Sequence, residues 1–470
     1  MNTLSKETRH NYSNIYVCMV LLIKFLHLFI SVVCFYFAWI YFRYESFTYS
    51  DSIGFRYNYF VTALFLVLML YFSRVYSAYD FGFSRIRYII FGQFLAQSFA
   101  TICIYLFVTI AWWNLKNPIA FIILVLDLLS IDVILTLAFS STLYKLLPRR
   151  RTLLIYQNKL AKKRFGSVKG KPIERLFKIV DEIEFDGDFS DIKDKVDEFD
   201  AVFVAGVNSD CRNALLKYCK INGITIYLLP HIGDVIMREA YHEKSFYSPV
   251  FRISRKTVDP AFAFIKRSFD IASSGLALVL LSPIMLVTAL AIKLYDKGPA
   301  FYKQVRLTKD GREFEIIKFR SMRVDAEKDG VARLSSGDND DRITPIGRFI
   351  RKCRIDELPQ LINIFKGDMS VVGPRPERPE IAEQYYETMP EFELRLQVKA
   401  GLTGYAQIYG KYNSDPYEKL EFDLLYINQM NLLTDLLLCF ATFAILFRSE
   451  STEGVEEGQT TAMDYDEINE

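Results

Sequence analysis

The apolar run that decides the fold of the C-terminal part of this chain is Ile271–Tyr295, IASSGLALVLLSPIMLVTALAIKLY. It is long enough to cross a bilayer, which takes about 20 mostly apolar residues. Ser282-Pro283 lies at its middle, where proline removes a backbone donor and kinks or breaks a helix. The run therefore predicts a membrane-inserted segment that is interrupted at its centre.

Positive charge flanks both ends of this run, at Lys266, Arg267, Lys293, Lys297, Lys303 and Arg306. A spanning helix is expected to show an asymmetry of positive charge instead. We therefore expect a re-entrant helix over 266–295 that enters one leaflet and returns to the cytosolic face. Ser282 and neighbouring helices can supply partners for the backbone groups freed at the break. The alternative is a kinked fifth span, which would place the rest of the chain on the opposite side.

Four apolar runs precede this segment, in a block that we place at 1–147. They are Tyr16–Phe42, Tyr57–Phe72, Tyr88–Trp112 and Ile119–Leu143, and the second is the shortest. Asp127 and Asp132 lie within the fourth run, and because charges in a membrane are costly we expect both to face other helices. Lysine and arginine gather before the first run, between the second and third, and after the fourth. The positive-inside rule then places both ends of this transmembrane four-helix bundle in the cytosol.

The composition is consistent with a membrane protein. Hydrophobic residues make up 51% and aromatic residues 15% of the 470 residues, which is high for a soluble protein. The seven cysteines show no metal-ligand spacing and no paired framework. All four histidines precede the C-terminal module, so chemistry there must use carboxylates or other groups.

The middle segment, 148–255, alternates short apolar strands with polar helical stretches. The expected strands are Thr152–Tyr156, Ala201–Ala205 and Ile224–Leu229, with a helix over Asn213–Asn222. This alternation predicts a small, Rossmann-like α/β module with a parallel sheet. The turn after the first strand, Gln157-Asn158-Lys159, lacks the glycine fingerprint of a dinucleotide site. A folded spacer or regulatory module is therefore favoured over nucleotide binding.

The C-terminal module, 262–448, brings carboxylates and arginines together in a short segment. It reads Arg354-Ile355-Asp356-Glu357-Leu358-Pro359-Gln360, then Gly367-Asp368-Met369-Ser370 and Gly373-Pro374-Arg375-Pro376-Glu377. Arginines close to carboxylates favour a phosphate substrate, because guanidinium groups bind phosphate oxygens in bidentate fashion. Two further motifs flank this segment, Lys318-Phe319-Arg320-Ser321-Met322 before it and the glycine loop 401–407 after it.

With these motifs in this order, residues from about Lys266 to Phe447 resemble the bacterial sugar transferase family, the monotopic phosphoglycosyl transferases. The whole chain resembles their large form. The motifs that carry the resemblance are KFRSM, Arg-x-Asp-Glu-Leu-Pro-Gln, GDMSVVGPRPE and GLTGYAQ. The resemblance implies an α-rich monotopic catalytic module. It also implies transfer of a sugar phosphate from a UDP-sugar to undecaprenyl phosphate, the first membrane step of exopolysaccharide, capsule or O-antigen synthesis. Lys399-Ala400 departs from the Arg-Pro of many members, which puts a phosphate role there in doubt.

The resemblance also implies residue roles. Asp356 is expected to carry a covalent phosphosugar, formed with release of UMP, which the lipid phosphate then attacks. Glu357 is expected to bind Mg²⁺ or to help deprotonate the acceptor. Arg375, whose backbone Pro374 and Pro376 fix, is assigned to the phosphates of the sugar nucleotide. Candidate ligands for the lipid phosphate are Arg354 and Arg351, while Lys318 and Arg320 could bind a phosphate or anionic headgroups, or be solvated charges.

The remaining expectations concern the surroundings of this module. Leu432–Phe447 predicts an interfacial helix, and residues 449–470 form an acidic tail. The expected location is the bacterial inner (cytoplasmic) membrane, with several passes and the catalytic module on the cytosolic face. Besides the lipid bilayer, a homodimer is a possible partner arrangement through the α/β module, and no nucleic acid is expected.

Two other functions stay open. The first is an inactive membrane scaffold or sensor of polysaccharide assembly, which the intact Asp356, Glu357 and Arg375 disfavour. The second is a glycosyltransferase that uses Asp338-Asn339-Asp340 as a metal motif, although the polar residues around it indicate a surface loop. The sequence does not identify the sugar.

Overall fold

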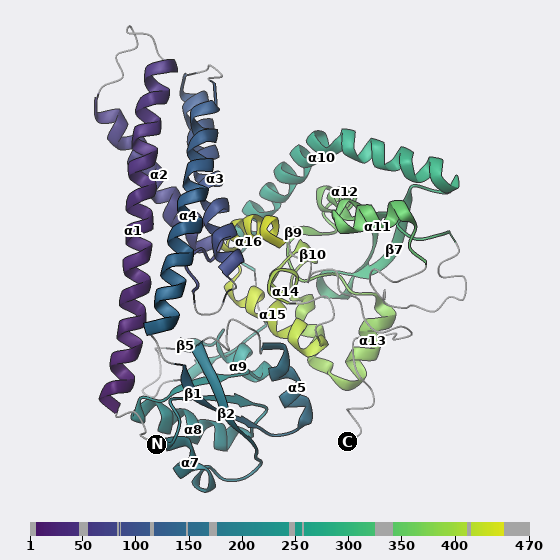
Figure 1. Cartoon of the computed structure of the whole chain (residues 1–470). Coiled ribbons are helices and arrows are strands. Elements are labelled where there is room, and N and C mark those ends of the chain that lie inside the picture. The colour runs from purple at the N-terminus through teal and green to yellow at the C-terminus, as the bar shows by residue number, and fades with distance from the viewer. Residues whose placement is uncertain are drawn as a thin grey trace. The chain divides into compact units, whose positions relative to one another are not determined.

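In the computed structural model of the chain, the described residues are 6–46, 55–81, 84, 86–112, 117–146, 149–168, 176–243, 250–255, 258–324, 342–410 and 415–445. They form two compact units, Met1–Pro230 and His231–Glu470 (Figure 1). Asp338-Asn339-Asp340 and the acidic tail lie outside the described residues, so the expectations for these two segments stay predictions.

The first unit begins with four apolar helices. They are α1 (Lys6–Ser46), α2 (Phe55–Val75), α3 (Ile86–Trp112) and α4 (Ile119–Leu146). Each contains a segment long and apolar enough to cross a membrane, including the short second run. Both α1 and α3 pack against α2 and α4. The four predicted apolar runs are thus confirmed as helices.

Polar side chains meet inside these four helices. Nε2 of His27 lies beside Oδ1 of Asp132, which also accepts a hydrogen bond of 3.0 Å from Gln97, and the Tyr79 hydroxyl lies beside Nδ1 of His27. Asp132 is fully buried, as predicted. Asp127 is exposed, so the prediction that it faces other helices is wrong. Five positions along an α-helix turn it by roughly 140°, so the two aspartates cannot face the same neighbours.

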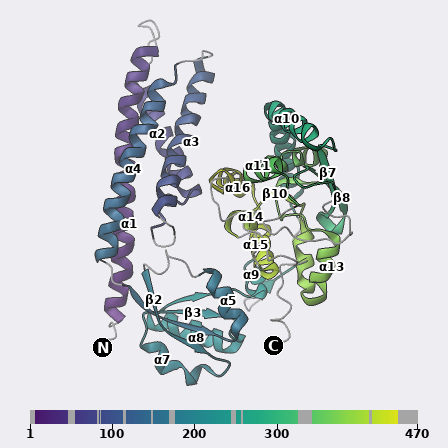
Figure 2. The ribbon, with the colours of Figure 1, turned by 45° about the vertical axis from the view of Figure 1, so that its right-hand side comes forward.

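A four-stranded parallel sheet completes the first unit (Figure 2). Its order is β2-β1-β3-β4, with β1 (Arg150–Tyr156), β2 (Phe177–Glu184), β3 (Ala201–Ala205) and β4 (Thr225–Leu228). Phe165 of α5 (Lys159–Val168) packs on one face, and Leu215 of α8 (Ser209–Asn222) packs on the other. The short helices η1 (Phe189–Asp191) and α7 (Lys193–Asp197) lie between β2 and β3 in the chain. The predicted parallel α/β module is confirmed.

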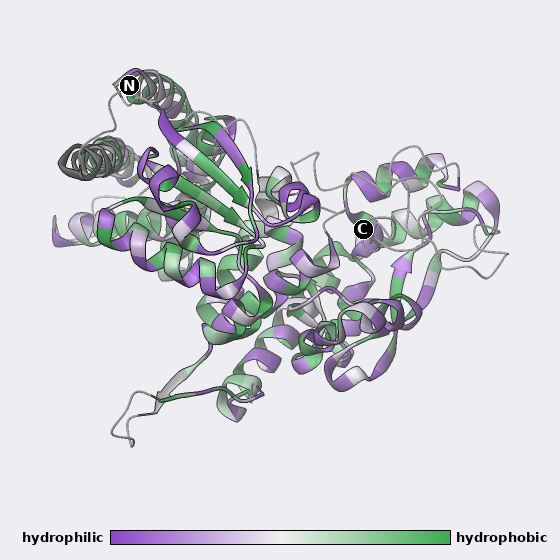
Figure 3. Cartoon of the chain, turned by 90° about the horizontal axis from the view of Figure 1, so that it is seen from below, coloured by the Kyte–Doolittle hydropathy of each residue, from purple (hydrophilic) through white to green (hydrophobic). Residues whose placement is uncertain are grey.

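The sequence missed strand β2. Three of its four exposed positions carry charged residues, and exposed side chains alternate with buried or partly buried ones, as in an edge strand. The strands β1 and β3 next to one another in the sheet have largely buried hydrophobic residues, and Figure 3 shows hydrophobic and hydrophilic residues along the ribbon.

The second unit contains the C-terminal module. Its elements before the acidic pair are α9 (Ile232–Met237), β5 (Tyr241–Glu243), β6 (Val250–Arg252), α10 (Pro260–Asp296), β7 (Phe301–Leu307), η2 (Lys309–Gly311), β8 (Glu313–Phe319) and α11 (Pro345–Lys352). From the pair onward they are η4 (Ile355–Glu357), α12 (Gln360–Lys366), β9 (Ser370–Val372), α13 (Pro379–Thr388), η5 (Pro390–Gln397), β10 (Gly401–Thr403), α14 (Tyr405–Tyr409), α15 (Pro416–Gln429) and α16 (Leu432–Ile445). The unit starts at His231 rather than near 255, since Ile232 and Val235 pack into its core.

Helix α10 is continuous over 37 residues, with Pro283 inside it. Proline cannot donate to the carbonyl of Val279 one turn earlier, and the Ser282 hydroxyl donates to that oxygen instead, at 2.7 Å. The helix bends without being interrupted (Figure 1), so the predicted interruption at its centre is wrong. Its inner side packs on β8 and α12, and its outer side exposes the apolar residues Leu276, Val279, Leu280, Leu286, Val287, Leu290 and Leu294.

Candidate active site

The acidic pair Asp356-Glu357 lies in a tight turn between two helices, α11 and α12. Arg354 adopts a left-handed conformation with φ of 57°, which non-glycine residues adopt rarely. This residue turns the chain out of α11 and into the single turn η4, which contains the pair. The local backbone therefore fixes two adjacent carboxylates at one point of the unit.

Glu357 is surrounded by cations from three parts of the chain. Its Oε1 lies 2.8 Å from Nη2 of Arg375 and 3.5 Å from Nζ of Lys318, and its Oε2 lies 3.7 Å from Nη1 of Arg354. Lys318 comes from β8 and Arg375 from the loop after β9. Asp356 takes part in none of these three contacts. Glu357 thus holds the cations in place beside a neighbouring carboxylate that they do not pair with.

Burial and nearby charges shift the pKa values of the two carboxylates in opposite directions. Burial raises the pKa of Asp356 to about 6, and the negative charge of Glu357 adds to this effect. Burial alone would raise the pKa of Glu357 as well, but the charges of Arg375 and Lys318 hold it well below its usual range. Burial also lowers the pKa of Lys318 to about 8, although Glu357 acts in the opposite direction. At neutral pH the pair therefore carries two negative charges next to its cations.

The other predicted phosphate ligands fall into two groups. The positive charge of Arg351 acts on Asp356, and its Nη1 is buried and makes no hydrogen bond within the described part of the chain. Arg320 instead pairs with Asp296 at the end of α10, and only 7% of its side chain is exposed. The structure thus brings Lys318, Arg351, Arg354 and Arg375 to the acidic pair and leaves Arg320 engaged elsewhere.

Residues 373–377, which we call the arginine loop, follow β9. The Gly401 amide donates to the carbonyl of Pro374 at 2.8 Å, and the Gly373 amide donates to that of Thr403, also at 2.8 Å. A Cβ atom on Gly401 would collide with the backbone of Gly373. The two glycine loops of the sequence are therefore packed backbone against backbone, and this contact fixes the position of Arg375.

A buried ion pair, Arg395–Asp423, binds the backbone of the arginine loop. Nη2 of Arg395 donates to the carbonyl of Arg375 at 2.8 Å and lies 2.7 Å from Asp423. Only 4% of Arg395 and 1% of Asp423 is exposed. Sequence reasoning missed both residues. Each stands among apolar neighbours, and a charge in an apolar stretch is the signal that could have drawn attention to them.

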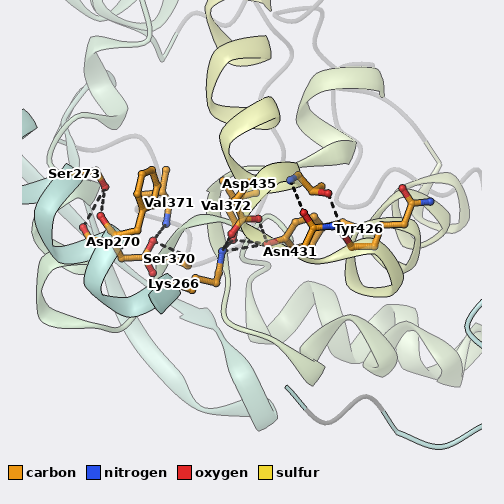
Figure 4. Close-up of polar contacts among 12 residues, drawn as sticks. Lys266, Asp270, Ser273, Ser370, Val371, Val372, Tyr426, Asn431 and Asp435 are labelled. Atoms are coloured by element: carbon orange, nitrogen blue, oxygen red, sulfur yellow. Dashed lines mark hydrogen bonds and ion pairs between the residues drawn. The ribbon is translucent and has the colours of Figure 1, made fainter. Parts of the chain in front are cut away.

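A second polar cluster ties α10 to β9 (Figure 4). Nζ of Lys266 donates to the carbonyl of Val372 at 3.1 Å and to Asp435 of α16 at 2.5 Å. The carboxylate of Asp270 accepts from the amide of Val371 at 2.9 Å. Since β9 leads directly into the arginine loop, this cluster connects the apolar helix α10 to the loop that contains the arginine nearest Glu357.

Among the described residues, the predicted metal ligand Glu357 does not belong to a group of side chains that could hold a metal ion by themselves. Among the described residues, no group of three or more histidine, cysteine, aspartate or glutamate side chains could hold a metal ion. Magnesium is often held by one or two carboxylates together with the phosphates of a substrate. The two adjacent carboxylates fit that second arrangement, in which the ion would arrive with its phosphate ligand.

Comparison with known proteins identifies the family. A family model described as bacterial sugar transferase matches residues 261–449. The chain is 43% identical over 234 residues to the UDP-N-acetylgalactosamine-undecaprenyl-phosphate N-acetylgalactosaminephosphotransferase of Aeromonas hydrophila. The aligned residues make up 48% of this chain and 53% of that protein. It is 38% identical over 191 residues to the UDP-glucose:undecaprenyl-phosphate glucose-1-phosphate transferase of Caulobacter vibrioides. The aligned residues make up 40% of this chain and 71% of that protein. The chain belongs to the bacterial sugar transferase family.

The shared part is limited in extent. A third relative, the UDP-glucose:undecaprenyl-phosphate glucose-1-phosphate transferase of Escherichia coli, is 37% identical over 223 residues, which are 46% of this chain and 48% of that protein. The chain spans about half the length of several curated relatives that it matches. The family membership therefore rests on the C-terminal module, and this is the part that contains the acidic pair.

Proposed function

We propose that this chain transfers a sugar phosphate from a UDP-sugar to undecaprenyl phosphate, giving undecaprenyl-diphosphate-sugar and UMP. The observation that carries the proposal is the acidic pair with its four surrounding cations, Lys318, Arg351, Arg354 and Arg375. Arginine and lysine side chains gathered at one point can bind phosphate oxygens through charge-assisted hydrogen bonds. The printed activities of the relatives supply the acceptor, undecaprenyl phosphate. This reaction would begin the synthesis of an exopolysaccharide, capsule or O-antigen.

In the proposed first step, a carboxylate oxygen of Asp356 attacks the phosphorus that carries the sugar. The bond from that phosphorus to the bridging oxygen breaks, and UMP leaves with the electron pair. In the second step, an oxygen of undecaprenyl phosphate attacks the same phosphorus and the Asp356 carboxylate is released. A covalent intermediate splits one difficult transfer into two easier ones. Asp356 suits the role because it is mostly ionised at neutral pH and pairs with none of the cations that hold Glu357.

Arg375 and Lys318 would bind the phosphates in both steps. Positioning and neutralisation of charge provide most of the catalysis in phosphoryl transfer. Mg²⁺ is proposed as the cofactor, held by Glu357 together with the substrate phosphates, where it would neutralise charge on the phosphate oxygens. Arg354 would keep Glu357 oriented while the substrate enters.

The proposed topology places the active site at the cytosolic surface of the bacterial inner membrane. We infer that α10 is re-entrant, because both of its ends bind the same folded unit. At one end Arg267 donates to the carbonyl of Ile364 at 2.7 Å, and at the other Asp296 pairs with Arg320. Apolar side chains exposed along the outer side of α10 would lie in one leaflet. The four N-terminal helices would form a transmembrane bundle with both ends in the cytosol.

The proposal is tested by nucleotide release. Purified full-length protein is incubated with a panel of UDP-sugars, undecaprenyl phosphate and Mg²⁺, and wild type is compared with Asp356→Asn and, as a matched control, Asp338→Asn. UMP release with one sugar, lost only in Asp356→Asn, is the expected result. Release of UDP, or loss of activity only in Asp338→Asn, would support the glycosyltransferase instead. No release from any sugar nucleotide would favour the inactive scaffold.

A further inference from the structure

The N-terminal part of α10 binds the strand that leads into the arginine loop. Lys266 and Asp270 lie one helical turn apart and therefore on the same side of α10. Nζ of Lys266 donates to the carbonyl of Val372 at 3.1 Å, and the Asp270 carboxylate accepts from the amide of Val371 at 2.9 Å (Figure 4). The same strand, β9, also pairs with β10. It is therefore held between the apolar helix and the second glycine loop.

Lys266 is a largely buried cation with three partners. Besides the carbonyl of Val372, its Nζ donates to Asp435 of α16 at 2.5 Å and to the hydroxyl of Tyr426 at 3.2 Å. Only 14% of the Lys266 side chain and 1% of that of Asp435 is exposed. An ammonium group has three protons, so the partners match its donors in number. A lysine near the end of a membrane helix usually extends to the bilayer surface, whereas this one binds the interior of the folded unit.

The backbone between Val372 and Arg375 has little freedom. Only Gly373 and Pro374 separate the two residues. The Gly373 amide donates to the carbonyl of Thr403 at 2.8 Å, and the ring of Pro374 fixes its own φ angle. A displacement of Val372 is therefore passed on to the backbone of Arg375.

Arg375 reaches Glu357 only from a well-defined backbone position. Nη2 of Arg375 lies 2.8 Å from Oε1 of Glu357, and Arg395 donates to the Arg375 carbonyl at 2.8 Å. Arg395 thus binds Arg375 itself, while Lys266 binds the strand just before it. A misplacement of about 1 Å in a phosphate-binding group can cost roughly 10²-fold in rate. The contact of Lys266 with β9 therefore bears on the reaction as well as on the fold.

We propose that Lys266, with Asp435 as its counter-ion, is a positioning residue that holds β9 and thereby directs Arg375 toward the phosphates of the donor. This role rests on the proposed function, and it gives the apolar helix α10 a part in the reaction besides anchoring. Lys266 acts through Arg375 and takes no part in the chemical steps. The competing interpretation is that Lys266 and Asp435 only stabilise the fold.

A double-mutant cycle on UMP release by full-length protein separates these two interpretations. Lys266→Met should lower kcat/KM for the UDP-sugar about tenfold when Arg375 is present. In Arg375→Ala protein the same change should cost less than about twofold, because the residue that it positions is already gone. Lys293→Met, at an exposed position near the other end of α10, is the control and should keep full activity. Losses of equal size in both backgrounds would overturn the proposal.

A further variant removes the effect of an unpaired buried charge. Lys266→Met leaves Asp435 without a cation, which by itself can destabilise the fold. Lys266→Met combined with Asp435→Asn removes that charge, yet Val372 still lacks the ammonium donor. The thermal midpoint of unfolding should then return toward that of wild type, while kcat/KM stays about tenfold low. Recovery of full activity together with the midpoint would overturn the proposal.

Hydrogen exchange gives a measurement that does not depend on turnover. In Lys266→Met, peptides covering residues 370–377 should exchange at least about tenfold faster than in wild type, because β9 has lost a contact. Peptides of α13, which packs against η5 and β7, are the reference and should not change. Unchanged exchange over 370–377 would overturn the proposal even if activity falls. Faster exchange there, with no UDP-sugar turned over by wild type, would support the positioning of the arginine loop while the proposed function fails.

Discussion

Both units of this chain shield carboxylates from solvent, but they surround them differently. In the first unit the fully buried Asp132 meets His27 and Gln97, and these contacts join three helices. In the second unit Asp356 and Glu357 are partly exposed and lie among four cations. Cations beside partly exposed carboxylates can also bind phosphate oxygens, whereas a fully buried contact is closed to a ligand. The comparison teaches that solvent access together with gathered cations, more than burial alone, distinguishes a candidate site from a structural contact.

The largest expected effect tests the acidic pair at its proposed nucleophile. Asp356→Asn should lower UMP release by at least about 10³-fold, because loss of a nucleophile removes the covalent route. The measurement is the initial rate with a UDP-sugar and undecaprenyl phosphate. A matched carboxylate, Asp368→Asn, lies outside the pair and is expected to retain most of the activity. Equal losses in both variants would remove the distinction between the two carboxylates.

The next effect tests the cation closest to Glu357. Arg375→Ala should reduce kcat/KM by about 10²-fold, as expected when one preorganised donor to a developing charge is lost. Arg375→Lys should recover part of this loss, since it keeps the charge but not the bidentate geometry. Steady-state kinetics with the donor varied would measure both. Full activity in Arg375→Ala would mean that this arginine is not used in the reaction.

The pH dependence of activity is expected to be smaller and to have two limits. Protonated Asp356 cannot attack, so activity should fall as the pH drops through about 6, by roughly tenfold per unit below it. Above about pH 8 the Lys318 cation is lost, so activity should fall again. A profile of kcat/KM from pH 5 to 9 gives both limits. A flat profile between pH 5 and 7 would contradict the assignment of Asp356 as the attacking carboxylate.

The smallest effect on activity is expected in the buried cluster around Asp132. Asp132→Asn removes a buried charge beside His27 and should lower the thermal midpoint of unfolding by a few degrees, with UMP release changed less than about twofold. The exposed Asp127→Asn on the same helix is the control and should change neither quantity. A loss of activity in Asp132→Asn at unchanged stability would show that this cluster, too, serves the reaction.

Sequence patterns predicted the structural features that depend on residues close together in the chain. The four apolar helices and the Ser282 contact follow from runs of sequence and from the chemistry of proline. Sequence assigned Arg375 to the sugar-nucleotide phosphates, Arg354 to the lipid phosphate, and Lys318 to a phosphate, a headgroup or solvent, and the structure brings all three to Glu357. These residues could be singled out because each stands in a motif of the resemblance, although the motifs come from three parts of the chain.

Contacts between distant segments were not predictable in this way. Arg320 was expected to bind a phosphate or a headgroup or to be solvated, but it pairs with Asp296 at the C-terminal end of α10. Arg395 and Asp423 support Arg375 from behind, and their pairing depends on how η5 packs against α15. Strand β2 was missed because its charges suit an edge that only the finished sheet defines. In each case the partner is supplied by tertiary packing, which no local pattern records.

The bend of α10 bears on how the chain is inserted during synthesis. A straight α-helix of this length would measure about 55 Å, well beyond the roughly 30 Å hydrocarbon core of a bilayer. With Pro283 bending the helix and the Ser282 hydroxyl bound to the Val279 carbonyl, the segment can enter and leave one leaflet as a preformed arch. On the proposed topology, no polar residue that follows α10 has to be translocated. The fifth apolar helix, α10, would then not need the machinery that inserts the first four helices. The catalytic module could bind the membrane through α10 after it leaves the ribosome.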